Sequence, residues 1–542
     1  MGLNNDIIEY IISLSEPKYA CRWMETCRFF YAEVPRILLV NQEITVNTAE
    51  RLSLFLWWLL IDGLRRFPFV RSLAIGICYP SEQVARELLA AIPLMRGLSH
   101  LHIYHGKTVL KHIPALADVI TALGSLRTLH VQVGSLQTLR MFKCLQSTLV
   151  DAKVDFQADY VLTDQWQGTL HPVLPDDWRE YHPLDLLAHS SSTLKTLVIS
   201  GSWYGLEQTA PRAAPVYPRM QRLTVTGAPP PPTVVLVRAF PNLTHLCVRA
   251  GHDSYLDHPA TSHTTLAKFD ARRASNYATT RKSRPVSWDK LEEVAGCACD
   301  LFALGLTCPV ENIELSHVED KHFYMLGPML ADTCPRKLYA RCWPDRNSDG
   351  TYDVFSPLSG PGGSQLTALY ISLFIATASK DDRVAAVRAI LESLLSSVQH
   401  APLQELQLDL CIRVKKSKSE RLKEYPPPSP FPKTRLRCTR EHWVYREITP
   451  ATHADDHAPT SGRNLKEIDL QAYVRRLLQR VPTLCDVHVS VDALLFPTFC
   501  DVPFSVDALS DTCRQVSMRN GQMQYVDVSH RVEPPVHSSQ CD

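Results

Sequence analysis

The 542-residue sequence lacks an excess of one charge and a long apolar run. Lys and Arg number 57 and Asp and Glu 56, so the formal net charge is +1. This balance excludes the global positive field that draws nucleic acid or anionic membranes. The longest apolar run, Leu54 to Ile61, is far shorter than the roughly 20 residues needed to span a bilayer. We therefore expect no membrane span and no nucleic-acid partner.

The N-terminus lacks the pattern of a secretory leader, since Asp6 and Glu9 stand where an apolar core is expected. The 16 cysteines show no framework spacing. Both observations predict a reducing compartment, the cytosol or the nucleus. Cys21 and Cys27 are too far apart on one helix for a disulfide. Cys27 instead continues a helical apolar stripe, which predicts a packing role: Ala20, Trp23, Met24, Cys27 and Tyr31.

Catalytic signatures are also missing. The sequence contains no phosphate-binding loop, nucleophile elbow or zinc-protease helix. Two other groups lack paired ligands at the spacing of a closed tetrahedral zinc site: His100, His102 and His105, and Cys297, Cys299 and Cys308. We expect neither enzymatic activity nor a cofactor or metal, and an enzyme with an unrecognised site is the alternative.

An aliphatic triplet recurs along the chain, with its second residue three positions after the first and its third two positions later. The copies are Val70/Leu73/Ile75, Leu98/Leu101/Ile103, Leu126/Leu129/Val131, Leu194/Leu197/Ile199, Met220/Leu223/Val225, Leu243/Leu246/Val248, Val310/Ile313/Leu315, Leu366/Leu369/Ile371, Leu403/Leu406/Leu408, Leu465/Ile468/Leu470 and Leu484/Val487/Val489. The first three copies are 28 residues apart, and prolines stand just before many others. Helical patterns such as residues 380–399 fill the intervals. Each unit is therefore predicted to be a strand plus a helix, stacked in a solenoid. An ordinary α/β domain with parallel strands is the alternative.

The triplets resemble leucine-rich repeats, which have about 20 to 29 residues per repeat. The resemblance covers roughly residues 67–492 and implies an irregular α/β solenoid over 67–499, with parallel strands on the concave face and helices on the convex face. Gly106, Ser202 and Gly251 stand where this family usually has Asn or Cys, so the backbone turns must be satisfied otherwise. We expect a helical connector and N-terminal cap at 41–66, insertions near 157–190 and 413–463, and a C-terminal cap and tail at 500–542. The basic run from 413 to 423 in the second insertion is read as a solvated charge run or an import signal.

Residues 1–40 precede the first triplet and form a predicted helical unit. Ile7, Ile8, Ile11 and Ile12 recur at helical spacing, and Pro17 suits the first position of a second helix. The stretches DIIEYI and METCRFFY, the latter followed by Val34 and Pro35, resemble the F-box of fungal F-box proteins with leucine-rich repeats.

This resemblance implies a substrate receptor that binds the Skp-type adaptor of a cullin-RING ubiquitin ligase, with the repeats selecting the protein substrate. It places Leu3, Ile7, Ile8 and Ile11 against the adaptor, and it makes Cys27 and Phe30 internal packing residues. The alternative is an interaction scaffold whose N-terminal helices only cap the first repeat.

Strand alternation predicts which side chains line the concave face, because neighbours of buried triplet residues point the other way. The partner-binding candidates are His100, His102, Tyr104, His130, Arg222, His245, Arg249, Glu314, Glu405, Asp409, Glu467, Asp469 and Asp486. Their charge becomes acidic toward the C-terminus, which predicts a substrate with a basic surface. A merely solvated sheet face is the alternative.

Overall fold

The computed structural model describes residues 5–15, 17–156, 160–161, 171–172, 182–201, 215–227, 232–249, 262–282, 287–344, 354–377, 380–414, 469–493, 513–519 and 522–528. The chain divides into two compact units, Met1–Ser316 and His317–Asp542. Fourteen parallel strands alternate with helices along these residues. The predicted α/β class is therefore confirmed.

Three helices open the first unit: α1 (Asn5–Leu14), α2 (Pro17–Trp23) and α3 (Arg28–Asn41). Their shared core consists of Ile12, Ala20, Val34, Ile37 and Leu38, against which Trp23, Met24 and Phe30 pack. The predicted start of the second helix at Pro17 and the packing of Phe30 are confirmed.

The predicted packing role of Cys27 is wrong. A turn follows Trp23, whose carbonyl accepts hydrogen bonds from both the backbone N–H and the hydroxyl of Thr26. Cys27 is then extended, with φ −159° and ψ 163°, and precedes the first residue of α3. The helical stripe is thus interrupted, and the side chains of Cys21, Cys27 and Tyr31 are exposed.

The first unit continues with ten strands, of which each pairs with the next in the order given. They are β1 (Glu43–Val46), β2 (Ser72–Ile75), β3 (His100–Ile103), β4 (Thr128–Gly134), β5 (Asp151–Phe156), β8 (Thr196–Gly201), β9 (Arg222–Thr226), β10 (His245–Arg249), β11 (Leu291–Cys297) and β12 (Val310–Glu319), whose last three residues belong to the second unit. Two short strands, β6 (Tyr160–Val161) and β7 (His171–Pro172), pair separately.

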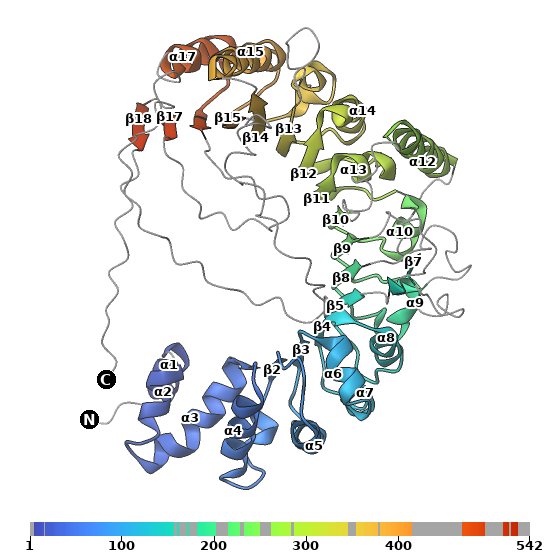
Figure 1. Ribbon diagram of the computed structural model, residues 1–542, viewed down its shortest axis with the longest axis vertical. Coiled ribbons are helices and arrows are strands. Elements are labelled where there is room, and N and C mark those ends of the chain that lie inside the picture. Colours follow the sequence, from blue (N-terminus) through green and yellow to red (C-terminus); the bar gives the residue numbers. More distant parts are fainter. Residues whose placement is uncertain are drawn as a thin grey trace, which may run out of the picture. The chain divides into compact units, whose positions relative to one another are not determined.

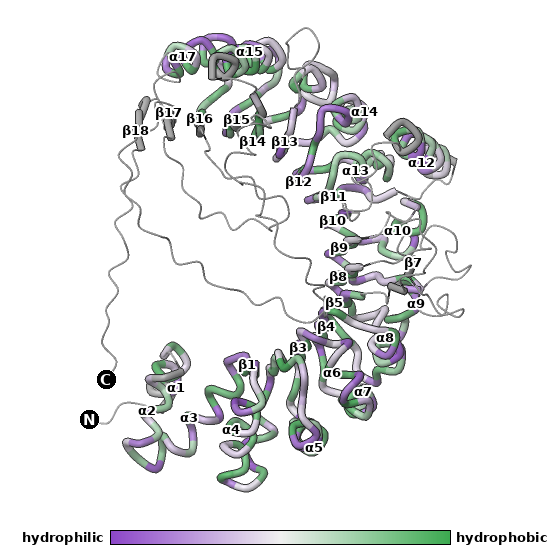
Figure 2. The backbone as a smooth tube through the Cα atoms, viewed as in Figure 1, coloured by the Kyte–Doolittle hydropathy of each residue, from purple (hydrophilic) through white to green (hydrophobic). Residues whose placement is uncertain are grey.

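Helices connect these strands, and α6 to α10 lie along one side of the strand row (Figure 1). They are α4 (Ala49–Leu60), α5 (Glu82–Ala91), α6 (Gly106–His112), α7 (Ala115–Thr121), α8 (Leu136–Lys143), α9 (Pro183–Leu186), α10 (Thr233–Ala239), α12 (Ser262–Lys282) and α13 (Ala298–Leu304). In Figure 2 the strands of this unit change between apolar and polar residues along their length. This alternation places one face of the sheet in the core and leaves the other open.

The triplets are in register from strand to strand. Leu73 pairs with Leu101, which pairs with Leu129, and Leu197, Leu223 and Leu246 are matched in the same way. Each of these leucines is at most 2% exposed. The predicted role of the triplets as a shared core between stacked strands is confirmed here.

Main-chain atoms close the turn that leads into each strand. The carbonyl of Arg71 accepts hydrogen bonds from the N–H groups of Ser99 and His100, and Ser99 then accepts two from the following repeat. This arrangement, in which one carbonyl accepts from two successive N–H groups, is termed a fork. It recurs at Arg127, Val150, Lys195, Gln221 and Thr244, with N···O distances of 2.7–3.2 Å. This ladder satisfies the turns before the strands with main-chain atoms, whereas the position where the family usually has Asn or Cys follows the strand, as at Gly106. At Gly106, moreover, a Cβ atom would lie 2.3 Å from the Val131 side chain.

The second unit contains the strands β13 (Lys337–Trp343), β14 (Ala368–Thr377), β15 (Glu405–Val414) and β16 (Asp486–Ala493), parallel and in this order. An antiparallel pair, β17 (Cys513–Arg519) and β18 (Gln522–Val528), follows at the edge of β16. The helices are α14 (Phe323–Thr333), α15 (Lys380–Val398) and α17 (Leu470–Arg480). The Tyr473 hydroxyl of α17 donates to the Leu391 carbonyl of α15 over 2.8 Å, which joins the two helices.

One predicted triplet is wrong. Leu470 begins helix α17 instead of ending a strand, and Asp469 caps that helix by accepting the N–H of Ala472 over 2.9 Å. Leu465 and Ile468 lie outside the described residues. So do Ser202, Gly251 and most of the two predicted insertions.

Candidate protein-binding surfaces

Helix α1 exposes an apolar row. Ile7, Ile11 and Leu14 lie at helical spacing and are 48%, 37% and 69% exposed, while Ile12 on the opposite side is fully buried. Tyr10 adds a ring that is 65% exposed. Of the four predicted adaptor contacts, Ile7 and Ile11 therefore share a solvent-exposed face. Leu3 and the side chain of Ile8 lie outside the described residues.

Charged contacts fix α1 on α3. Arg36 of α3 donates to Glu9 of α1 over 2.9 Å and to Glu33 of its own helix over 2.7 Å. The carboxylates of Glu33 and Glu9 raise the pKa of Arg36 through hydrogen bonding and charge. The buried side of α1 is thus held both by Ile12 and by this ion pair, and its apolar row faces away from them.

The predicted histidines of the first unit meet on the open face of β3 and β4. His102 and His130 are Cα partners, and their rings stack with centroids 4.3 Å apart and planes 8° apart. His102 Nδ1 lies 3.0 Å from Glu43 and His130 Nε2 lies 3.1 Å from Asp151. Burial and then the neighbouring His130 lower the pKa of His102. His102 therefore favours the neutral imidazole, and each of the two rings has a nitrogen beside a flanking carboxylate.

His100 and Tyr104, two more of the residues predicted for the concave face, lie beside this pair. His100 is exposed on β3, where its Nδ1 lies 2.8 Å from the Ser99 hydroxyl. Tyr104 is half-buried just beyond the end of β3.

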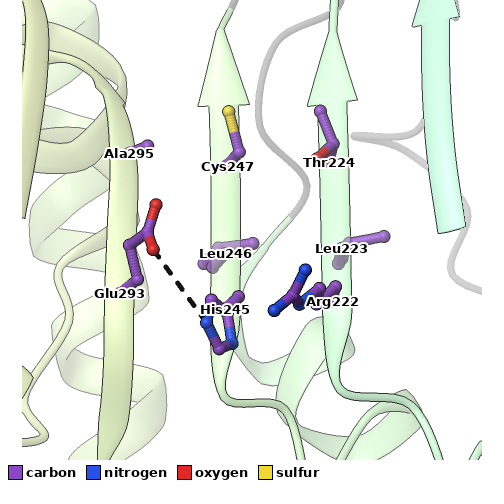
Figure 3. A pocket seen from close by; sticks show the side chains of 8 residues that line it. All are labelled: Arg222, Leu223, Thr224, His245, Leu246, Cys247, Glu293 and Ala295. Atoms are coloured by element: carbon purple, nitrogen blue, oxygen red, sulfur yellow. Dashed lines mark ion pairs between the residues drawn. The ribbon is translucent and has the colours of Figure 1, made fainter. Parts of the chain in front are cut away.

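A cavity of about 220 Å³ opens on the same sheet face at β9 to β11 (Figure 3). One row across the strands consists of Arg222, His245 and Glu293, and the next consists of Thr224, Cys247 and Ala295. The second row has shorter side chains, which leaves the hollow. His245 Nε2 is 3.9 Å from Glu293. Burial raises the pKa of the Cys247 thiol, so this residue supplies a neutral thiol rather than a thiolate.

Two predicted residues line this cavity, and two others lie near it. Arg222 and His245 line it, and Arg249 forms a 3.8 Å ion pair with Glu314 close enough for both to affect the pKa of Cys247. Pattern reading missed Glu293 and Ala295 because β11 has no complete aliphatic triplet, and it passed over Thr224 and Cys247 although both follow recognised triplet leucines. His245 and Glu293 are separated by more than a hydrogen-bond distance. Either group can therefore bind a polar side chain of a ligand instead.

The predicted acidic residues of the second unit lie in three different settings. Glu405 and Asp486 are exposed Cα partners at the start of β15 and β16. Asp409 is half-buried on β15, where it accepts a 2.8 Å hydrogen bond from Gln407. Asp469 is a helix cap rather than a strand residue, so its predicted place on the open face is wrong, and Glu467 lies outside the described residues.

Buried cysteines of the first unit are thiols. Burial raises the pKa of Cys297 to about 12 and that of Cys308 to about 11, and it raises the pKa of Cys299 as well. A raised pKa disfavours the thiolate that binds zinc. Among the described residues, no three His, Cys, Asp or Glu side chains are grouped so that they could hold a metal ion.

No family model matches the chain, and no curated protein matches it either. Within the described part of the chain, no helix combines the length and the apolarity that a membrane crossing requires.

Proposed function

We propose that the protein is a substrate receptor of a cullin-RING ubiquitin ligase. Its three N-terminal helices bind the Skp-type adaptor, and the open face of its parallel strands binds a protein substrate. Such a receptor needs no catalytic residue, because holding the substrate beside a charged ubiquitin carrier makes the transfer effectively intramolecular. The cytosol or nucleus is the compartment where these partners meet.

The exposed apolar row of α1 carries this proposal. A helix in a small unit normally turns its apolar side inward, and α1 does so with Ile12. It nevertheless presents Ile7, Ile11 and Leu14 to solvent. A contiguous exposed apolar row marks a surface that another protein covers. If these helices only capped the first repeat, the apolar row would face the repeat, so the exposed row favours the receptor over the scaffold alternative.

Capture of the adaptor tests the proposal. The purified chain is mixed with immobilised Skp-type adaptor, and the variant carrying Ile7→Asp and Ile11→Asp is compared with the unmodified chain. Each aspartate would be buried unpaired in the interface, so we expect at least about a hundredfold loss of affinity. The matched control is Leu54→Asp on α4, because Leu54 is 66% exposed and lies outside the N-terminal helices.

Two results decide between the candidates. Retained capture by the control, with lost capture by the α1 variant and unchanged circular dichroism of both, supports the receptor. Failure of the unmodified chain to bind the adaptor overturns it and favours the scaffold.

A further inference from the structure

Helix α4 of the first unit is apolar on two opposite sides. Its inner side consists of buried leucines: Leu52, Leu56 and Leu59. Its outer side carries four large apolar residues at helical spacing, of which the last follows the helix end: Leu54, Trp57, Leu60 and Ile61. These four residues, termed the α4 row, are between 44% and 66% exposed.

The size of the α4 row indicates a binding surface. A helix that is apolar all round is normally buried. Since a fully exposed large apolar side chain offers roughly 200 Å², the four residues expose on the order of 500 Å². A contiguous apolar patch of this size often marks a binding site. Two such rows packed together would bury about 1,000 Å², which reaches the lower limit of a specific interface.

The α4 row has an exposed charge at each end. Glu50 is exposed and stands four residues before Leu54, so it lies on the same side of the helix. Arg65 is exposed and follows the end of the helix, next to Arg66, which folds back to pair with Asp62. Among the described residues, neither Glu50 nor Arg65 takes part in an ion pair. The row thus begins with an anion and ends near a cation.

These two charges make the surface complementary to itself. In a two-fold symmetric pair, the same patch of each copy faces the other. Trp57 lies close to the middle, because Glu50 precedes it by seven residues and Arg65 follows it by eight. Antiparallel packing of two rows would therefore bring each Glu50 to the Arg65 of the other copy. It would also oppose the two helix dipoles, which is favourable. Arg51 is exposed as well, but it lies about 100° around the helix from Glu50.

We propose that the α4 row binds a second copy of this chain, with the two α4 helices antiparallel about a two-fold axis. An uncharged apolar surface would leave Glu50 and Arg65 without partners, whereas a second copy supplies a partner for both. The pairing goes beyond the proposed function, because adaptor capture and substrate binding need only one chain.

Sedimentation velocity of the full chain over a range of concentrations tests the pairing. We expect the mass to double with rising concentration, and Trp57→Ala to weaken the association at least about tenfold, because a central aromatic residue carries much of the affinity of an interface. Glu50→Arg and Arg65→Glu should each weaken it at least about threefold, since symmetry places like charges at two contacts. The chain with both reversals should recover the original affinity within about twofold, because each contact then pairs opposite charges again.

Glu82→Arg is the matched control. Glu82 is an exposed carboxylate in the first turn of α5, and α5 begins, like α4, at a residue with a capping hydroxyl. Reversal of its charge should leave the association unchanged. Circular dichroism of every variant checks that the fold is retained.

Several results overturn the pairing. A chain that remains monomeric up to about 0.1 mM has no specific interface at α4. If the double reversal recovers nothing, or if Glu82→Arg acts like Glu50→Arg, the two charges do not meet across an antiparallel pair. Co-sedimentation of a monomeric chain with phosphatidylcholine vesicles means that a membrane surface is the occupant instead.

Adaptor capture reports on the proposed function separately. It is measured below the concentration at which the unmodified chain associates, where every variant is monomeric. Leu54→Asp should then keep the capture of the Skp-type adaptor and lose self-association at high concentration. Loss of both by Leu54→Asp means that the adaptor covers the α4 row, which overturns the pairing. Failure of the unmodified chain to bind the adaptor overturns the proposed function alone.

Discussion

Removal of one triplet leucine should loosen the strands on both sides of it. Leu246 of β10 is 1% exposed and is the Cα partner of Leu223 on β9 and Val294 on β11. Leu246→Ala removes three buried carbons and leaves a cavity in a core that two neighbouring strands share. For such fully buried leucines the cost is about 3 kcal/mol. Since about 1.4 kcal/mol corresponds to a factor of ten, local opening should become roughly a hundredfold more frequent.

Hydrogen exchange followed by mass spectrometry measures this opening at the amides of β9, β10 and β11. The matched control is His245→Ala, because His245 is the adjacent residue and points to the open face. Its exchange should change by less than a factor of about three, as for an ordinary surface substitution. If Leu246→Ala and His245→Ala accelerate exchange equally, or if only β10 responds to Leu246→Ala, the shared core inferred from the strand register is refuted.

Three further substitutions probe the packing and the charges. Gly296→Ala should lower the unfolding midpoint in a thermal scan, because its Cβ would lie 2.1 Å from the Val248 carbonyl, whereas Gly124→Ala, with nothing within 4 Å, should not. Asn276→Ala should cost about 1–3 kcal/mol in urea unfolding, because the buried amide bonds backbone groups of α10 and α13. The hydrogen bond from His317, helped by Lys321 and opposed by burial, lowers the pKa of Glu319 from its ordinary 4.5 to about 2. Its stabilising effect is therefore present above pH 4.5 and lost as the pH falls to 2, and Glu319→Gln should flatten urea-unfolding stability over that window.

Most fully aliphatic triplets lie on strands, with the one ending at Leu470 as an exception, and β5, β11 and β13 were missed because a small residue stands at an aliphatic position of each. Ala152, Gly296 and Ala340 occupy those positions. The structure shows a reason at Gly296, where the neighbouring backbone of β10 approaches too closely for any side chain. A search for aliphatic triplets detects only large apolar side chains. The structure requires only that the residue at each triplet position fit between its neighbours.

Open-face residues were predictable only where the strand itself was correctly placed. Arg222 and His245 lie within triplets that form strands, and both line the cavity. Asp469 lies within a triplet that does not form a strand, and it caps a helix. The outward rings of Tyr339 and Trp343 were missed because outward positions were read only in recognised triplets, and β13 contains none. The alternation of polar or aromatic residues from Lys337 to Trp343 is the signal that could have revealed them.

The forked carbonyl ladder has a consequence for how this chain can change over time. The forked bonds join main-chain atoms, so any substitution except proline leaves them in place, although side chains such as those of Ser99 and Thr244 add bonds of their own. Exposed positions can then drift freely, and intervals between repeats can lengthen without breaking the stack. A protein built in this manner can acquire new binding specificities while the side chains by which its relatives would be recognised are replaced.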